Sequence, residues 1–394
     1  MIIAAVICEY NPFHNGHKYQ LDTIRRKLKA DYIICIMSGD YVQRGEPAIF
    51  PKELRTKWAL ENGADLVLQL PTPYSTGSAD LFAYGAVTIL NKLGCVDYLC
   101  FGSECGDIDT LCICADKLIT EGQVGSEGMR ALMKKGNTFA KSRYLLFPEF
   151  DVLLAHSNNV LALEYIMALT HTKSKIKPYT IKREGEAYED DSLLEDEKYL
   201  SSTAIRRAIL SGEGVKIRKF LPYDISAIKD RPLCANVFSS ELFYSLLINQ
   251  SCLPEYLDSS EDLSKRIINS LNEFSNYSSF TDLIKSKNYT YSRISRTLLH
   301  ILLGIKGSNT LYKETIKHIS HVKVLGFKES SQMLLTTISD NSEITLLTKV
   351  PKIYENANSV TKDLFDMELF ASTLYNRASG CEIHEYSKPL VLTK

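Results

Sequence analysis

The stretch NPFHNGH, residues 11–17, places two histidines three positions apart with a glycine between them. Imidazoles can donate hydrogen bonds to phosphoryl oxygens, whose negative charge grows as a pyrophosphate group departs. Gly16 has no side chain, so the backbone at that position can come close to a phosphate. Residues of this type at this spacing suit phosphoryl chemistry. The pair alone does not establish a phosphate site, so the prediction depends on where the two histidines lie in the fold.

Apolar periodicity indicates the elements that hold this pair. Residues 2–8 form a continuous apolar run, as in a buried parallel strand, and apolar residues at helical spacing follow from Tyr19 to Leu28. Further strands are expected at 31–37, 64–71, 96–102 and 177–183, and further helices at 51–63, 78–94 and 158–169. The histidines would then lie at the carboxyl ends of parallel strands and at a helix N-terminus, a place that favours anions.

This alternation predicts an α/β fold, with a Rossmann-like parallel-sheet domain and helices on both faces of the sheet. From about residue 220 the pattern changes to helical segments with polar loops, so a mainly helical region is expected to follow. We therefore predict one domain at 1–220 and a second at 221–394. The acidic run 184–197, with eight Asp or Glu and no Lys or Arg, is interpreted as a mobile loop.

Composition narrows the class of protein. A formal net charge of -1 excludes a globally basic nucleic-acid coat, although a local basic face remains possible. The ten cysteines show no zinc-finger spacing, and we interpret them as small apolar residues in a reducing compartment. The chain has no signal-peptide pattern and no apolar run of the roughly 20 residues that span a bilayer. We expect a cytoplasmic protein with no membrane and no DNA among its partners.

The segment NPFHNGH resembles the H-x-G-H signature of the nucleotidyltransferase superfamily, and a longer series of motifs resembles the bacterial tRNA(Met) cytidine acetate ligase family. In order, the motifs are ICEYNPFHNGH, MSGDYVQRGEPA, ADLVLQLP, FGSE, SNNVLALEYI, YTIKR, LSSTAIRRAI and VKVLGF. The resemblance spans essentially the whole chain. It implies a nucleotidyltransferase domain and a helical tRNA-binding region. The implied reaction activates acetate with ATP as acetyl-adenylate and then acetylates N4 of the wobble cytidine of elongator tRNA(Met).

The resemblance also implies site residues. The histidines His14 and His17 would stabilise the transition state at the α-phosphate and the departing pyrophosphate. ATP would contact the nucleotide loop, which consists of Ile7, Cys8, Glu9, Tyr10, Asn11, Pro12, Phe13, His14, Asn15, Gly16, His17, Lys18, Tyr19 and Gln20. Further positions on the ATP side would be Gly102, Asn158 or Asn159, Arg183, Ser201, Ser202, Thr203 and Arg206. From the residues alone, the serines can instead be a plain helix N-cap, Gly102 a turn glycine and the asparagines helix caps.

The segment SGDYVQRG follows the second expected strand, so Asp40 and Arg44 would lie at the same edge of the sheet as the histidines. Asp40 is a third catalytic candidate: it can orient an imidazole, bind Mg²⁺ or cap a turn, and the sequence does not choose. Arg44 can attract acetate. In the segment after Arg183, where a histidine after the tyrosine is expected of the family, this chain has Glu189 after Tyr188.

The chemistry implied needs ATP and Mg²⁺, the metal being held largely by phosphate oxygens and water, with no protein metal ligands assigned. The basic second half suggests how tRNA is held, since residues 265–328 contain eleven Lys or Arg against three Asp or Glu. The candidates for a phosphate-binding face with stacking platforms are Arg293, Arg296, Lys306, Lys313, Lys317, Lys323, Tyr289, Tyr291 and Tyr312. Two alternatives stay open: an enzyme that adenylylates a small molecule, and a catalytically silent RNA-binding protein.

Overall fold

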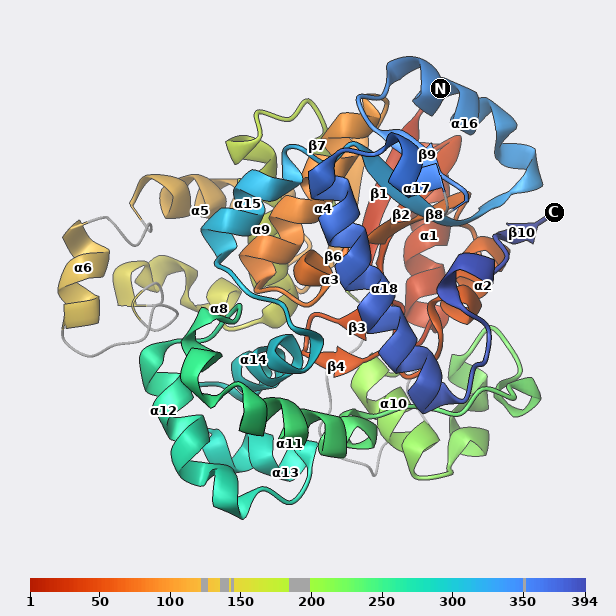
Figure 1. Cartoon of the computed structure of the whole chain (residues 1–394). Coiled ribbons are helices and arrows are strands. Elements are labelled where there is room, and N and C mark those ends of the chain that lie inside the picture. Colours follow the sequence, from red (N-terminus) through yellow and green to blue (C-terminus); the bar gives the residue numbers. More distant parts are fainter. Residues whose placement is uncertain (122–126, 135–141, 143–144, 184–198, 350–351) are drawn as a thin grey trace.

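The computed structural model describes residues 1–121, 127–134, 142, 145–183, 199–349 and 352–394. Its centre is a mostly parallel sheet with the strand order β10-β8-β5-β2-β1-β6-β7, and β9 pairs with β8 (Figure 1). These strands are β1 (Ile3–Cys8), β2 (Tyr32–Ser38), β5 (Leu66–Leu70), β6 (Tyr98–Ser103), β7 (Lys177–Lys182), β8 (His321–Lys328), β9 (Thr345–Leu347) and β10 (Val391–Thr393). A short antiparallel pair, β3 (Tyr41–Val42) and β4 (Glu46–Pro47), follows β2.

Helices cover both faces of the sheet, as the alternation predicts. The helices of the first half are α1 (Asn15–Leu28), α2 (Lys52–Glu61), α3 (Thr72–Ser75), α4 (Ala79–Leu93), α5 (Ile108–Thr120), α6 (Glu127–Lys134), α8 (Asp151–Leu154), α9 (Ser157–His171) and α10 (Ser202–Leu210). Alternate residues of β1 point to opposite faces. Ala4 and Val6 belong to the core with α1 and α2, whereas Ala5 and Ile7 belong to the core with α4 and α9. The buried apolar run at the start of the chain is thus a central strand covered on both sides.

The second half begins with the expected helical segments. They are α11 (Ser239–Ile248), α12 (Glu261–Ser270), α13 (Tyr277–Ile284) and α14 (Tyr291–Leu303), which gather at one end of the molecule, below the sheet in Figure 1. The chain continues through α15 (Asn309–Ile316), α16 (Gln332–Asn341), α17 (Lys352–Asn356) and α18 (Ser359–Ser379). The long helix α18 crosses the front of the sheet in this view (Figure 1).

The structure does not follow the expected division at residue 220. Strand β8 pairs antiparallel with β5, so Leu66 lies opposite Phe327, and β10 pairs parallel with β8. One continuous core includes both Ile3 and Tyr375. The reason is that β8 carries the buried apolar residues Val322, Val324 and Leu325, which complete a sheet edge that β5 would otherwise leave open. The second half therefore helps to build the sheet.

Within the described ranges, no single helix has both the length and the apolar composition to cross a membrane. The pair Pro148–Leu154 and Ser157–His171, bent at 109°, meets these two criteria only when its helices are taken together. The expected mobile loop at 184–197 lies outside the described residues.

Candidate active site

The two histidines cap the first helix reciprocally. His14 is the N-cap of α1, and its Nδ1 accepts a hydrogen bond from the Gly16 N–H at 3.0 Å. The His14 N–H in turn donates to Nδ1 of His17 at 3.3 Å, and the two rings stack with their centroids 3.8 Å apart. Because Nδ1 is the acceptor in both rings, each neutral ring carries its proton on Nε2. The helix cap thus selects the tautomer that presents an Nε2–H donor.

Gly16 is required by this stack as well as by any phosphate. A Cβ atom at Gly16 would lie 2.9 Å from Cε1 and 3.0 Å from Nδ1 of His14, which is closer than such atoms pack. Helix capping therefore explains why a glycine stands between the two histidines, because a residue without a side chain leaves room for the imidazole that caps the same helix.

Both imidazoles are held neutral at physiological pH. Burial, with help from the nearby charges of Arg183 and Arg206, lowers the pKa of His14 to about 3. Burial, with a further contribution from the charges of His14 and Arg183, lowers the pKa of His17 well below its ordinary value. The pair can therefore offer neutral N–H donors, but no positive charge, to an anion.

This low pKa predicts a pH dependence of stability. In the unfolded chain His14 binds a proton near pH 6.5, whereas the folded protein binds it only near pH 3, so the folded state loses stability as the pH falls between these values. Each such histidine should lower the free energy of unfolding by about 1.4 kcal/mol for every unit by which the pH falls within this range. Urea denaturation at pH 7, 6 and 5 measures the slope. The variant His14→Asn, which keeps an N-cap residue, should show a shallower slope, and an unchanged slope would contradict this assignment.

The Ser-Ser-Thr turn lies beside the histidines, as the motif order predicts. Ser201 is the N-cap of α10 and accepts from the Ala204 N–H at 3.2 Å, as in a plain capping role. Ser202 is different, because its Oγ lies 2.9 Å from His14 Nε2. Arg206, one turn later, donates from Nη1 to the Asn11 carbonyl at 2.9 Å, whereas Thr203 is exposed. The structure thus joins two motifs that lie nearly 190 residues apart in the chain.

Gly102 and Arg183 form the neighbouring wall. Gly102 of β6 pairs with Ile181 of β7, and a Cβ atom at Gly102 would lie 3.2 Å from Cγ of Arg183. The Arg183 N–H donates to the Ser103 carbonyl at 2.9 Å, and its side chain is exposed. The positive charge of Arg183 contributes to the lowered pKa of both histidines. These residues occupy adjacent strands at the expected edge of the sheet.

The two asparagines have different positions. Asn159 is buried, and its Oδ1 accepts from the backbone N–H groups of Glu104 and Cys105 at 2.9 and 3.1 Å. Asn158 is half-buried and donates from Nδ2 to Glu104 at 2.6 Å. Glu104 also accepts from the Asn159 N–H at 2.8 Å, which makes it a cap of α9. Asn159 therefore anchors the loop after β6, and Asn158 is the one of the two that has room to contact a ligand.

Much of the predicted nucleotide loop forms core. The buried side chains are those of Ile7, Cys8, Tyr10, Asn11, Pro12, Phe13 and His14. Asn11 accepts from the Ile49 N–H at 2.7 Å, and Phe13 is fully buried. The half-buried side chains are those of Glu9, Asn15, His17, Lys18, Tyr19 and Gln20. Most of the buried residues can therefore meet a nucleotide only through their backbone.

The expectation that Asp40 faces the histidines is contradicted. Asp40 is fully buried, and its carboxylate accepts from Lys52 Nζ at 2.9 Å and from Ser372 Oγ at 2.7 Å. Lys52, also fully buried, makes a second ion pair with Glu385 at 2.8 Å. Although burial alone would raise it, the charge of Lys52 holds the pKa of Asp40 below its ordinary value. Asp40 thus joins the loop after β2 to α18, and we leave it out of the proposed catalytic groups. Arg44 is exposed on the loop between β3 and β4.

Most cations of the expected basic face have acidic partners in the structure. Arg296 pairs with Asp258 at 2.7 Å, and Lys313 pairs with Asp80 at 3.1 Å. Lys306 and Lys317 have acidic partners too, Lys323 is paired with buried Glu385, and the rings of Tyr289 and Tyr312 are buried. Arg296, Lys306, Lys313 and Lys323 are thus paired with acids from distant segments, whereas Lys317 pairs with Glu314 on the same helix turn.

Sequence reasoning missed Arg55, which organises this edge of the sheet. This fully buried guanidinium donates to the carbonyls of Glu9 and Ser38 at 2.6 and 3.2 Å, and also to those of Gly39 and Phe50. It therefore ties the ends of β1 and β2 together. An arginine in an amphipathic helix gives no sequence signal for such a position, because most arginines of this kind face solvent.

Comparisons with known proteins agree with this geometry. Residues 1–387 match the family model HIGH Nucleotidyl Transferase. The tRNA(Met) cytidine acetate ligase of Thermoanaerobacter sp. (strain X514) is 39% identical over 391 residues, which cover 96% of both chains. The protein of the same name from Clostridium perfringens (strain SM101 / Type A) is 36% identical, with 95% of both chains covered.

Solved structures show the same similarity in three dimensions. Thermotoga maritima TmcAL bound with alpha-thio ATP has a TM-score of 0.88 and 28% sequence identity, over 100% of this chain and 99% of that chain. The apo form I of TmcAL has a TM-score of 0.90 and 29% identity over the same shares. The predicted family and fold class are confirmed. The chain belongs to the HIGH nucleotidyl transferase family and, within it, to the family of the tRNA(Met) cytidine acetate ligases.

Proposed function

We propose that this protein uses ATP to join acetate to N4 of the wobble cytidine of elongator tRNA(Met), giving N4-acetylcytidine. The observation that carries the proposal is the stacked, neutral histidine pair beside Ser202, in a chain similar over nearly its full length to tRNA(Met) cytidine acetate ligases. A relative bound with alpha-thio ATP supports ATP as the nucleotide.

The first step forms acetyl-adenylate. A carboxylate oxygen of acetate attacks the α-phosphorus of ATP, and the bond to pyrophosphate breaks. In the structure no described residue accepts the proton on His17 Nε2, so this donor is available for the departing pyrophosphate. His14 Nε2–H donates to Ser202 Oγ at 2.9 Å, which leaves the Ser202 hydroxyl proton for the phosphate chain, and Arg206 would add a cation. The contribution of these groups is orientation and stabilisation of growing negative charge.

Magnesium would accompany the triphosphate. Across the residues that the structure describes, no group of three or more His, Cys, Asp or Glu side chains could hold a metal ion. We expect the ion to be held by phosphate oxygens and water, which is common for Mg²⁺ on nucleotides. When bound, the ion would neutralise charge on the phosphates.

The second step transfers the acetyl group. The exocyclic amine of cytosine attacks the acetyl carbon, AMP leaves with the former acetate oxygen, and the amine loses a proton. The tRNA must therefore bring its anticodon to the edge of the sheet where the histidines lie. We include a cytoplasmic location in the proposal, because that is where a free bacterial tRNA meets ATP and acetate.

We propose that a basic hollow between α12 and the loop before α14 contacts the tRNA. It is lined by the cations Lys265, Arg266 and Lys287, by the acid Asp262 and by the aromatic residue Tyr289. The Arg266 guanidinium is held by the carbonyls of Ile284 and Lys285, so its charge has a fixed position. Excess positive charge in a hollow suits the phosphate backbone of RNA.

This proposal predicts the effect of removing two lysines. The double variant Lys265→Ala/Lys287→Ala should weaken tRNA binding. The slope of the logarithm of the binding constant against the logarithm of the salt concentration should become shallower by about one for each lysine that contacts a phosphate. Filter binding at several salt concentrations measures this slope. The matched control is Lys306→Ala, because Lys306 is exposed but already paired with Glu255 at 2.9 Å. Equal slopes for both variants would exclude the hollow as a tRNA contact.

The overall proposal is tested by incorporation of radiolabelled acetate into elongator tRNA(Met), with each component omitted in turn. We expect label on the wobble cytidine that requires both ATP and the enzyme. If ATP is consumed but no label enters tRNA, the enzyme instead adenylylates a small molecule.

A further inference from the structure

A cavity lies between α18 and strands β8 and β9, on the far side of β2 from the histidine pair in the strand order. Its walls are mainly apolar and include Val322, Leu347, Leu364 and Phe365. The centres of water-sized molecules can occupy about 40 Å³ of it. This is room for about three or four atoms of the size of a water molecule.

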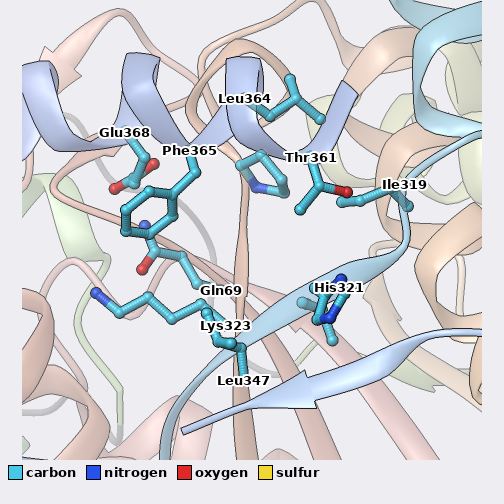
Figure 2. A pocket seen from close by; sticks show the side chains of 11 residues that line it. Gln69, Ile319, His321, Lys323, Leu347, Thr361, Leu364, Phe365 and Glu368 are labelled. Carbon is cyan, nitrogen blue, oxygen red and sulfur yellow. The ribbon is translucent and has the colours of Figure 1, made fainter. Parts of the chain in front are cut away.

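One polar side chain in this cavity has no partner. Gln69 of β5 is only 3% exposed, and neither its amide nitrogen nor its amide oxygen meets a hydrogen-bond partner in the described chain. Figure 2 shows its side chain beneath the Phe365 ring and beside Lys323. Leaving both ends of a buried amide unpaired is costly, so such a group points to a molecule that completes it.

Each of the other polar side chains that line the cavity has a partner, including His321, whose Nδ1 lies 2.9 Å from the Ser320 hydroxyl. Glu368 accepts from the Thr72 hydroxyl and lies 3.6 Å from Lys52 Nζ, and Lys323 pairs with Glu385. Thr361 accepts from the Ser320 N–H at 2.8 Å. Because each charge near the cavity has an opposite partner, an added charge would stay uncompensated. The missing molecule is therefore neutral, with one donor and one acceptor to match the Gln69 amide.

The position of Gln69 depends on a glycine in the loop after β2. A Cβ atom at Gly39 would lie 2.6 Å from Nε2 of Gln69 and 2.9 Å from Oε1 of Glu368. The Gly39 carbonyl accepts a hydrogen bond from Arg55, which also holds the Glu9 carbonyl of the nucleotide loop. A molecule bound to Gln69 would thus be connected to the nucleotide loop through Gly39 and Arg55, because the Arg55 guanidinium donates to the carbonyls of both Gly39 and Glu9.

We propose that this cavity, which we call the Gln69 cavity, binds a short neutral amide whose N–H and C=O pair with the Gln69 side chain and whose methyl group contacts Phe365 and Leu347. Acetamide, with four non-hydrogen atoms, has the size, polarity and lack of charge that the cavity requires. Two sources carry such an amide: a free carboxamide, whose N–H and C=O lie on one edge and can both pair with Gln69, and the N-acetyl group of an acetylated cytidine, a trans amide that can offer Gln69 only one of the two. The second source rests on the proposed function, whereas the first does not.

The test is binding of acetamide to the full-length protein, measured by ligand-observed NMR without ATP and tRNA. We expect binding by the wild type and a loss on the order of tenfold or more in Gln69→Leu. The matched control is Gln332→Leu, which makes the same chemical change at an exposed glutamine on α16 and should bind acetamide normally. Absence of acetamide binding by the wild type, or equal binding by Gln69→Leu, would overturn the proposal.

The melting temperature separates this role from a structural one. Without ligand, Gln69→Leu should melt at a higher temperature than the wild type, because it removes an unpaired buried amide. If Gln69→Leu melts at a lower temperature than the wild type and the wild type does not bind acetamide, the Gln69 amide is hydrogen-bonded to water and has a structural role. That result would contradict the proposal. If Gln69→Leu does not fold, Leu347→Phe, which fills the cavity from β9, should abolish binding instead.

A competition experiment with acetamide and N4-acetylcytidine distinguishes the two sources of the amide. Displacement of acetamide by N4-acetylcytidine would assign the Gln69 cavity to the acetylated base, and binding without displacement would assign it to a free carboxamide. Because these measurements need neither ATP nor tRNA, failure of the ligase reaction would not by itself remove the amide site.

Discussion

Replacing His17 by alanine is expected to lower the rate of acetate transfer to tRNA by about 10²–10³-fold. The reason is that His17 Nε2–H is a neutral donor with no acceptor in the described chain, held in position by the His14 N–H and by stacking on the His14 ring. Such a donor contributes most when negative charge grows on the departing pyrophosphate. ATP affinity should therefore change much less than the rate. Single-turnover transfer of labelled acetate and equilibrium binding of ATP measure the two quantities.

The control for this variant is His318→Ala. His318 is an exposed histidine that follows α15, so its replacement should leave both quantities unchanged. If His17→Ala transferred acetate at the wild-type rate, the histidine pair would not be part of the reaction.

Replacing Lys52 by methionine is expected to lower the free energy of unfolding by about 3–5 kcal/mol. This ammonium group is fully buried and ion-paired with Asp40 and Glu385, so its loss leaves Asp40 without its closest cation and removes one of the cations that neutralise Glu385. Although burial alone would lower it, these carboxylates hold the pKa of Lys52 well above its ordinary value. A loss of this size is a large part of the stability of an ordinary domain. Urea denaturation measures it.

Lys57→Met is the matched control on the same helix. Lys57 is exposed and pairs with Glu61 at 3.8 Å, so its loss should cost less than about 1 kcal/mol. Similar losses for the two variants would show that the buried ion pairs do not hold the loop after β2 to α18.

The sequence predicts those parts of the molecule that depend on local patterns. The apolar run at 2–8 and the helical spacing from Tyr19 to Leu28 correspond to β1 and α1, although α1 begins earlier, at Asn15. His14 and Ser202 are brought together as the motif order implies, because each follows an expected strand or precedes an expected helix at the same edge of the sheet.

Other features depend on contacts between distant segments, which a single sequence does not reveal. Strand β8 lies among helices in the chain, and only its pairing with β5 explains its place in the sheet. Asp40 and Arg296 look like exposed charges until Ser372 and Asp258 are seen beside them. The fully buried Arg55 is likewise recognisable only once β1 and β2 are side by side.

The most direct test of the central claim is exchange of labelled pyrophosphate into ATP, without tRNA, in the presence and absence of acetate. If the enzyme forms acetyl-adenylate at the histidine pair, exchange should require acetate, and His17→Ala should abolish it. Exchange that is independent of acetate, or that persists in His17→Ala, would contradict the proposed activation of acetate at this site.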